Sequence, residues 1–293
     1  MIRFAPVLAA VLLAACAAQP AAAPSPSATP SASPTAEPSP TPVPTATPSP
    51  RPDPPVAADE PAALARQLEE SERAIRDRTI SGVDLAWYGH LQQVVYRRLS
   101  ARPELRDAVF AALPAELRAL ATANLDATAD LRATVVPREE TPKAWRIVDP
   151  AAMDDLLRYY RAAEAEFGVP WPYLASIHLV ETRMGRIRGT STAGAQGPMQ
   201  FMPATWAAYG DGDINSDRDA IRAAARYLKA NGAPQNMANA LFRYNQSQRY
   251  VRAVTAYAEV MRAEPDAYRG YYHWQVYYLT TRGDILLPVG YGS

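Results

Sequence analysis

The chain contains little cysteine, lysine or histidine, and its charges balance. Cys16 is the only cysteine among 293 residues, which excludes an internal disulfide framework and a thiolate metal site. The 30 basic and 30 acidic side chains cancel and no basic stripe occurs, so we expect no nucleic-acid partner. Arginine far outnumbers lysine, which we attribute to coding bias and not to chemistry.

Long apolar runs are absent after the N-terminus, so no later transmembrane helix is predicted. Residues 1–15 combine Arg3 with a short apolar core, as in a signal peptide. Leu13-Ala14-Ala15-Cys16 is similar to a bacterial lipobox, in which the thiol receives a diacylglycerol. The alternative is an ordinary secretory signal that contains a cysteine. We expect lipidation at Cys16, and hence an extracytoplasmic protein anchored by lipid to the bacterial membrane in the cell envelope.

Half of the 28 prolines lie between Ala17 and Ala58, among alanine, serine and threonine. Such a composition cannot bury a core, and its prolines favour extended polyproline II. Residues 16–58 are therefore predicted to form a lipidated cysteine and a disordered linker. At roughly 3 Å per residue the linker could reach on the order of 100 Å from the membrane. An inert or glycosylated spacer is an equally compatible interpretation.

No period-2 run of any length occurs, and apolar residues recur at helical spacing, so the folded part is predicted to be all-α. Residues 59–140 are predicted to form an α-helical accessory region, with a helix beginning near Pro61 and an apolar stripe that includes Leu91 and Leu99. His90 is isolated in this region, and we expect it to be structural.

Residues 141–265 are predicted to form the main, catalytic domain. Glycine, proline and capping residues divide it into helices, which we expect over residues 150–167, 170–184, 203–209, 217–231, 237–244 and 249–261. The tail, residues 266–293, is rich in tyrosine and is predicted to pack on this domain, either covering the core or lining a groove.

Glu181 closes an apolar helix and shares one face with Leu174 and Ile177. A carboxyl group on an apolar face is costly to ionise, so its pKa should rise. A glutamic acid that stays protonated near neutral pH can protonate a glycosidic oxygen. The alternative is a salt-bridged glutamate at a helix end, whose partner would be one of three nearby arginines, Arg183, Arg186 or Arg188.

Two further segments provide groups that could contact a sugar. The loop from Gly189 to Pro203 has little side-chain bulk, so its backbone is open to hydrogen bonds, and Gln200 adds an amide. Tyr244 and Asn245 follow, where Tyr244 could donate a hydrogen bond to the carboxyl group of Glu181 or to a sugar. Taken singly, the loop is also consistent with a turn, and the pair with a buried tyrosine and a helix cap.

Five ordered segments carry a family resemblance: Glu181-Thr-Arg-Met-Gly185, Gly194-Ala-Gln-Gly-Pro-Met-Gln-Phe-Met-Pro-Ala-Thr205, Ala224-Ala-Arg-Tyr-Leu228, Tyr244-Asn245 and Tyr250-Val-Arg-Ala-Val-Thr-Ala-Tyr257. Over about residues 150–261 the chain resembles the catalytic domain of the soluble-type lytic transglycosylases, which are lysozyme-like enzymes that cut bacterial peptidoglycan. The resemblance implies a lysozyme-like all-α fold, glycan strands as substrate, no cofactor and no metal. We expect such an enzyme to act as a monomer.

The resemblance also assigns roles. Glu181 would protonate the oxygen between N-acetylmuramic acid and N-acetylglucosamine, then as carboxylate accept the muramoyl 6-hydroxyl proton, leaving a 1,6-anhydro sugar. Tyr244 would position Glu181, and Asn245 would shape the cleft. The glycan contacts from the loop would be Ser191, Gln200 and Met202.

The chain departs from the family pattern at three positions. Thr182 replaces a serine, Pro198 replaces an apolar residue, and Gln246 stands where some members have a second glutamate. Losing that glutamate weakens a hydrolytic scheme, which uses two carboxylates. Two alternatives nevertheless remain: a hydrolytic muramidase on the same fold, and a peptidoglycan-binding scaffold that has lost catalysis.

Metal binding is not predicted. Asp211, Asp213 and Asp217 suggest a calcium loop, but that loop requires glycine at its sixth position and glutamate at its twelfth, where this chain has Ser216 and Arg222. The three aspartates are more simply turn and cap residues. His178 has the His-x-x-Glu spacing of a metal pair with Glu181, but no further histidine lies nearby, so we expect His178 to be structural.

Overall fold

The computed structural model describes residues 51–292. The predicted signal peptide, the lipidation at Cys16 and most of the predicted linker lie outside the described residues. Within 51–292, no helix combines the length and the apolar character needed to cross a membrane.

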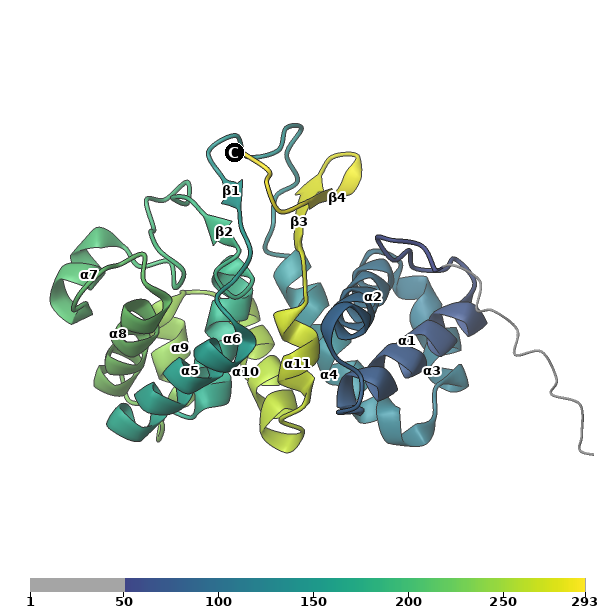
Figure 1. Cartoon of the computed structure of the whole chain (residues 1–293), viewed down its shortest axis with the longest axis horizontal. Helices are drawn as coiled ribbons and strands as arrows, with labels where there is room; N and C mark the ends of the chain where they lie inside the picture. Colours follow the sequence, from purple (N-terminus) through teal and green to yellow (C-terminus); the bar gives the residue numbers. More distant parts are fainter. Residues whose placement is uncertain (1–50, 293) are drawn as a thin grey trace, which may run out of the picture. The chain divides into compact units, whose positions relative to one another are not determined.

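The described part of the chain is mostly helical, which confirms the predicted fold class (Figure 1). In order its elements are α1 (Pro61–Arg76), α2 (Gly82–Ala101), the 3₁₀ helix η1 (Pro103–Leu105), α3 (Arg106–Ala112), α4 (Ala115–Arg132), β1 (Arg146–Ile147), α5 (Met153–Phe167), α6 (Trp171–Thr182), β2 (Ile187–Arg188), α7 (Pro203–Tyr209), α8 (Asp217–Ala230), α9 (Met237–Tyr244), α10 (Gln248–Ala263), α11 (Ala267–Tyr272), β3 (Val276–Thr280) and β4 (Gly283–Leu287).

Local sequence signals account for most helix ends in the predicted catalytic domain. Gly168 adopts the left-handed conformation that ends α5, with φ 71°. Ser216 caps α8 by accepting a hydrogen bond from the backbone N–H of Asp219. Pro203 lies at the start of α7, where its missing N–H costs nothing. The bounds of α7 and α9 are those predicted, and the other predicted helices of this region differ only at their ends.

Residues 51–58, predicted as the end of a disordered linker, instead pack on α1 and α2. The indole N–H of Trp87 donates to the carbonyl of Pro52 at 2.8 Å. The Gln67 amide donates to the carbonyl of Val56 and accepts from the N–H of Ala58, each at 2.9 Å. These side chains supply the partners that the proline-rich backbone cannot provide for itself, so the linker prediction was wrong for these residues.

The helices of the predicted accessory region and those of the predicted catalytic domain share one hydrophobic core. α4 packs on α2 on one side and on α10 on the other (Figure 1). The hydroxyl groups of Thr128 on α4 and Tyr257 on α10 are 3.0 Å apart. The packing therefore has no break near residue 140, where the sequence suggested a domain boundary.

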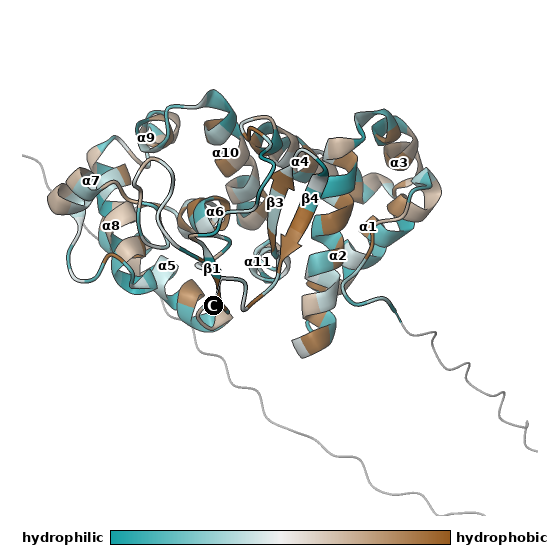
Figure 2. Cartoon of the chain, turned by 90° about the horizontal axis from the view of Figure 1, so that it is seen from above, coloured by the Kyte–Doolittle hydropathy of each residue, from teal (hydrophilic) through white to brown (hydrophobic). Residues whose placement is uncertain are grey.

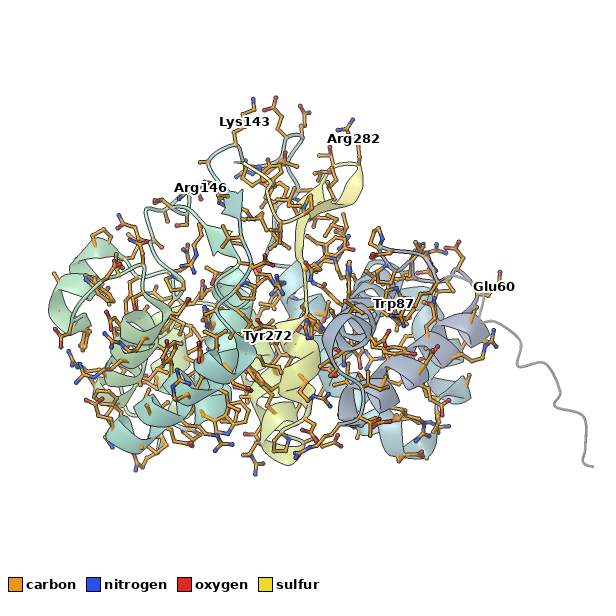
Figure 3. All side chains as sticks on the ribbon, in the orientation of Figure 1. Glu60, Trp87, Lys143, Arg146, Tyr272 and Arg282 are labelled. Atoms are coloured by element: carbon orange, nitrogen blue, oxygen red, sulfur yellow. The ribbon has the colours of Figure 1, made fainter. Side chains whose placement is uncertain are left out.

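The C-terminal segment lies between these two groups of helices. Figure 3 shows Tyr272 of α11 near the middle of the described part, and α11 contacts α1, α2 and α10. Tyr271 and Trp274 are buried against Tyr257, with ring centroids 5.3 and 5.6 Å from it. The tail thus packs on helices of the predicted accessory region as well as on the predicted catalytic domain.

The antiparallel hairpin β3–β4 was not predicted. Val276 pairs with Leu287 and Thr280 with Gly283, which leaves a two-residue loop. Most of its side chains are partly buried on both faces, so the alternation that identifies a strand in sequence is weak. Figure 2 shows the apolar residues of β4 beside β3. Val276 and Leu287 form a small cluster with Ile147 of β1.

Candidate active site

Glu181 lies in the last turn of α6, which packs between α5 and α10 (Figure 1). The phenolic O–H of Tyr250, in the first turn of α10, donates to Glu181 Oε1 at 2.8 Å. Burial raises the pKa of Glu181 to about 7, and the Tyr250 hydrogen bond lowers it by a smaller amount. The carboxyl group is therefore held as a mixture of acid and carboxylate near neutral pH.

The salt-bridge alternative for Glu181 is not realised among the described residues. Arg183 Nη1 donates to the carbonyl of Leu179 at 2.6 Å. The other two arginines are also turned elsewhere, Arg186 to the carbonyl of Tyr272 at 3.2 Å and Arg188 to Asp217 at 3.3 Å. Because Glu181 forms no ion pair within residues 51–292, no neighbouring cation offsets the effect of burial on its pKa.

Three consecutive residues in left-handed conformation turn the chain sharply after α6. Arg183, Met184 and Gly185 have φ values of 55°, 59° and 82°. The Thr182 hydroxyl donates to the carbonyl of Pro198 at 2.6 Å and accepts from the N–H of Gly185 at 3.1 Å. Thr182 therefore joins the helix end to the glycine-rich loop, and it does so with the hydroxyl that it shares with the family's serine.

The predicted loop lies next to Glu181, but two of its predicted sugar contacts also make bonds within the loop. Ser191 Oγ accepts from the N–H of Ala195 at 3.0 Å, and Gln200 donates from its amide to the carbonyl of Gly197 at 2.9 Å. Gln200 has φ 51°, a left-handed conformation that is uncommon outside glycine. Met202 is 44% exposed, so it presents an apolar surface to solvent.

The hydrogen bond to Glu181 comes from Tyr250, and not from Tyr244, which we had considered as a donor to this carboxyl group or to a sugar. Tyr244 donates to the carbonyl of Met199 at 2.6 Å, and its ring packs against Phe201 with centroids 6.0 Å apart. The reason is position: Tyr244 ends α9 and reaches the loop, whereas α10 packs directly on α6. Tyr250 belongs to the Tyr-Val segment that carried part of the resemblance, but no role was predicted for its hydroxyl group.

Asn245 caps the C-terminal end of α9, where its backbone N–H donates to the carbonyl of Leu241 at 2.9 Å. The residue is exposed, and it separates α9 from α10. Its placement beside Tyr244 is consistent with a position at the edge of the site.

A cavity of about 230 Å³ has Glu181 in its wall. Its wall is drawn from α2, α4, α6, α10 and β3, and includes Arg97, Arg183 and Tyr277. Glu181 is the one acidic side chain among the described residues that line it. No role was predicted for Arg97 or Tyr277, because nothing in the sequence placed α2 or β3 near Glu181.

His178 and the aspartates of the considered calcium loop are engaged in structural bonds. His178 is fully buried, with Nδ1 2.7 Å from the Tyr160 hydroxyl and Nε2 3.4 Å from Asp217 Oδ1. Burial alone would raise the pKa of Asp217, but His178 and Arg188 together lower it. Asp213 accepts from the N–H of Asn215 at 2.9 Å, as in a turn. Residues 51–292 contain no group of three or more His, Cys, Asp or Glu side chains suited to a metal ion.

A helical fold that presents a partly buried glutamate beside a glycine-rich loop is consistent with a lysozyme-like domain. Residues 189–238 match the family model described as "Transglycosylase SLT domain". The match confirms the resemblance to the lytic transglycosylases within residues 189–238, and such a domain indicates peptidoglycan cleavage in general. The matched segment spans the loop, α7 and α8, while Glu181 precedes it and Tyr244 and Tyr250 follow it. No curated protein and no solved structure matches the chain.

Proposed function

We propose that this protein is a lytic transglycosylase that cleaves the β-1,4 bond between N-acetylmuramic acid and N-acetylglucosamine in peptidoglycan, and that Glu181 carries the reaction. The observation that supports this most is the state of the Glu181 carboxyl group. Burial raises its pKa to about 7, and no cation within the described residues pairs with it. A general acid works best with a pKa near the operating pH.

In the proposed reaction Glu181 protonates the bridging oxygen, and the leaving sugar departs with that proton. The resulting carboxylate then accepts the proton of the muramoyl 6-hydroxyl, whose oxygen closes on C1 to form the 1,6-anhydro ring. Glu181 ends the cycle protonated, and no water is consumed. The Tyr250 hydrogen bond stabilises the carboxylate that exists between the two proton transfers.

A one-carboxylate reaction fits the surroundings of Glu181 better than a two-carboxylate hydrolysis. Hydrolytic glycosidases place a second carboxylate roughly 5–9.5 Å away to handle water or a covalent intermediate. Burial and Tyr250 account for the shift in the pKa of Glu181, with no contribution from another carboxylate. Gln246, where some family members have glutamate, lies exposed between α9 and α10.

The substrate contacts are proposed around the loop. Met202 offers an exposed apolar surface to a sugar ring, and Ser191, Gln200 and Asn245 offer polar groups. Tyr244 would act through the loop, since its hydroxyl holds the Met199 carbonyl. We further propose that the protein acts as a monomer, outside the cytoplasm, tethered to the membrane by lipid on Cys16.

Digestion of purified peptidoglycan by the wild-type chain and by Glu181→Gln, with mass analysis of the products, tests the function. We expect anhydro ends from the wild type and none from Glu181→Gln. Glu140→Gln is the matched control, because Glu140 is 74% exposed and pairs only with Lys143 among the described residues. Products heavier by one water would indicate a hydrolytic muramidase. Binding without turnover by the wild type would indicate a scaffold.

A further inference from the structure

The cavity beside Glu181 is lined by three arginines that come from three different elements. Arg97 belongs to α2, Arg132 to α4, and Arg183 follows the end of α6. With a volume of about 230 Å³ it exceeds the roughly 150 Å³ that admits a benzene ring. The cavity is thus large enough for a small substituent of a larger substrate.

One carboxylate forms ion pairs with two of these three guanidinium groups. Asp284 on β4 lies 2.8 Å from Arg97 Nη2 and 2.9 Å from Arg132 Nη1. Arg183 has no carboxylate within ion-pair distance among residues 51–292, and its one hydrogen bond is to a backbone carbonyl. With Glu181 protonated, the wall carries an excess of positive charge.

The charge and the backbone conformation of Arg183 are both energetically unfavourable in this position. Burial is the main cause that lowers the pKa of Arg183 to about 10; Tyr257 opposes it, and the positive charge of Arg97 adds a smaller lowering. Arg97 Nε is buried without a hydrogen-bond partner in the described part of the chain. In addition, Arg183 has φ 55°, which is unfavourable for a residue with a side chain. A partly buried guanidinium group with no ion-pair partner, together with backbone strain, is typical of a binding site.

We propose that Arg183, with Arg97 beside it, binds a carboxylate of the peptidoglycan strand next to the bond that Glu181 cleaves. This inference rests on the proposed function. A guanidinium group recognises a carboxylate through two parallel hydrogen bonds, which a buried site strengthens. Peptidoglycan offers such a carboxylate from two sources, the attached peptide and, where the peptide has been removed, the lactyl group of muramic acid.

Binding in the Glu181→Gln background tests this independently of catalysis. The Kd is measured by calorimetry for three glycan preparations: strands with peptides, strands stripped of peptides so that lactyl carboxylates are free, and stripped strands whose carboxylates have been converted to neutral amides. We expect the neutral strands to bind at least about tenfold more weakly than one of the two carboxylate-bearing preparations, as one charge-assisted pair would give.

Substitution of Arg183 should remove that difference. We expect Arg183→Gln to weaken binding of the preferred preparation by about 10- to 100-fold, and Arg183→Lys, which keeps the charge but not the fork, to lie between. Arg262→Gln is the control, because Arg262 is 66% exposed and pairs with Glu259 on the same helix. It should leave all three Kd values unchanged.

The pattern across the preparations decides the outcome. A loss confined to peptide-bearing strands would identify a peptide carboxylate, and a loss confined to stripped strands would identify the lactyl group. The inference would be overturned if the protein with Arg183 intact had the same Kd for all three preparations. It would also be overturned if Arg183→Gln weakened the binding of neutral strands as much as that of the preferred preparation. Carboxylate-dependent binding by a protein that yields no cleavage products in the wild type would instead contradict the proposed function.

Discussion

Removal of the Tyr250 hydroxyl should move the pH dependence of the reaction. The hydrogen bond from Tyr250 to Glu181 Oε1, at 2.8 Å, favours the carboxylate and so lowers the pKa that burial has raised. In Tyr250→Phe this opposing effect is lost, and the pKa of Glu181 should rise above its value of about 7.

The size of the shift follows from the strength of the bond. A hydrogen bond to a charged acceptor contributes roughly 1.5–3 kcal/mol, and one pKa unit corresponds to about 1.4 kcal/mol. We therefore expect a rise of about one unit, with water replacing part of the lost bond. Activity requires the protonated acid at the first step, so the alkaline limb of kcat/KM should move to higher pH by the same amount.

The assay is the pH profile of anhydro-product formation by the wild type, Tyr250→Phe and Tyr244→Phe. Tyr244→Phe is matched in size and location, but its hydroxyl bonds to the Met199 carbonyl and not to Glu181. It should lower the rate without moving the alkaline limb. An alkaline limb in Tyr250→Phe that is unchanged or lies at lower pH would refute the argument that this hydroxyl stabilises the carboxylate.

Four further predictions follow from single residues. The pKa of Glu181 is higher in the folded chain than in the unfolded chain, so its contribution to stability is lost as pH rises from about 4.5 to about 7. Measured by calorimetry, Glu181→Gln should therefore raise Tm relative to the wild type near pH 8, and raise it less near pH 5. A lower Tm of Glu181→Gln at both pH values would contradict this. Thr182→Val should destabilise the fold by about 1–3 kcal/mol in chemical denaturation and reduce activity, because the Pro198 carbonyl and the Gly185 N–H lose their partner; Thr182→Ser should retain both properties. Gly197→Ala should destabilise by about 2 kcal/mol or more, since φ is 73° and the new methyl would lie 2.0 Å from the carbonyl oxygen of Ile214; unchanged denaturation would contradict the observed turn. Cys16→Ala should move the protein from the membrane fraction to the soluble fraction of the envelope, and retention at the membrane would contradict lipid anchoring.

Local signals in the sequence predicted the helices of the predicted catalytic domain because most of their ends have a chemical cause within a few residues. Pro203 and Gly210 bracket α7, and Gly168 ends α5. The hairpin β3–β4 was missed because its strands are partly buried on both faces and show no clear alternation. Its pairing is stabilised by neighbours that no local pattern identifies, such as Ile147.

The candidate site was predicted in part. The sequence identified Glu181 and the loop, because an acidic residue on an apolar helix and a run of small residues are visible in one dimension. It did not identify Tyr250 as the partner of Glu181, which depends on how α10 packs on α6. Nor did it predict that Arg97 and Asp284, far apart in sequence, line or flank the same cavity as Arg183.

The wall beside Glu181 draws Arg97 from α2 and Tyr277 from β3, two elements about 180 residues apart in the chain. Completion of the site therefore requires the closure of a very long loop, which is an entropically costly and late event in folding. A chain that has been synthesised only as far as α11 has Glu181 but lacks the part of the cavity wall that β3 supplies. The order of synthesis thus delays the complete wall until nearly the whole chain has been made.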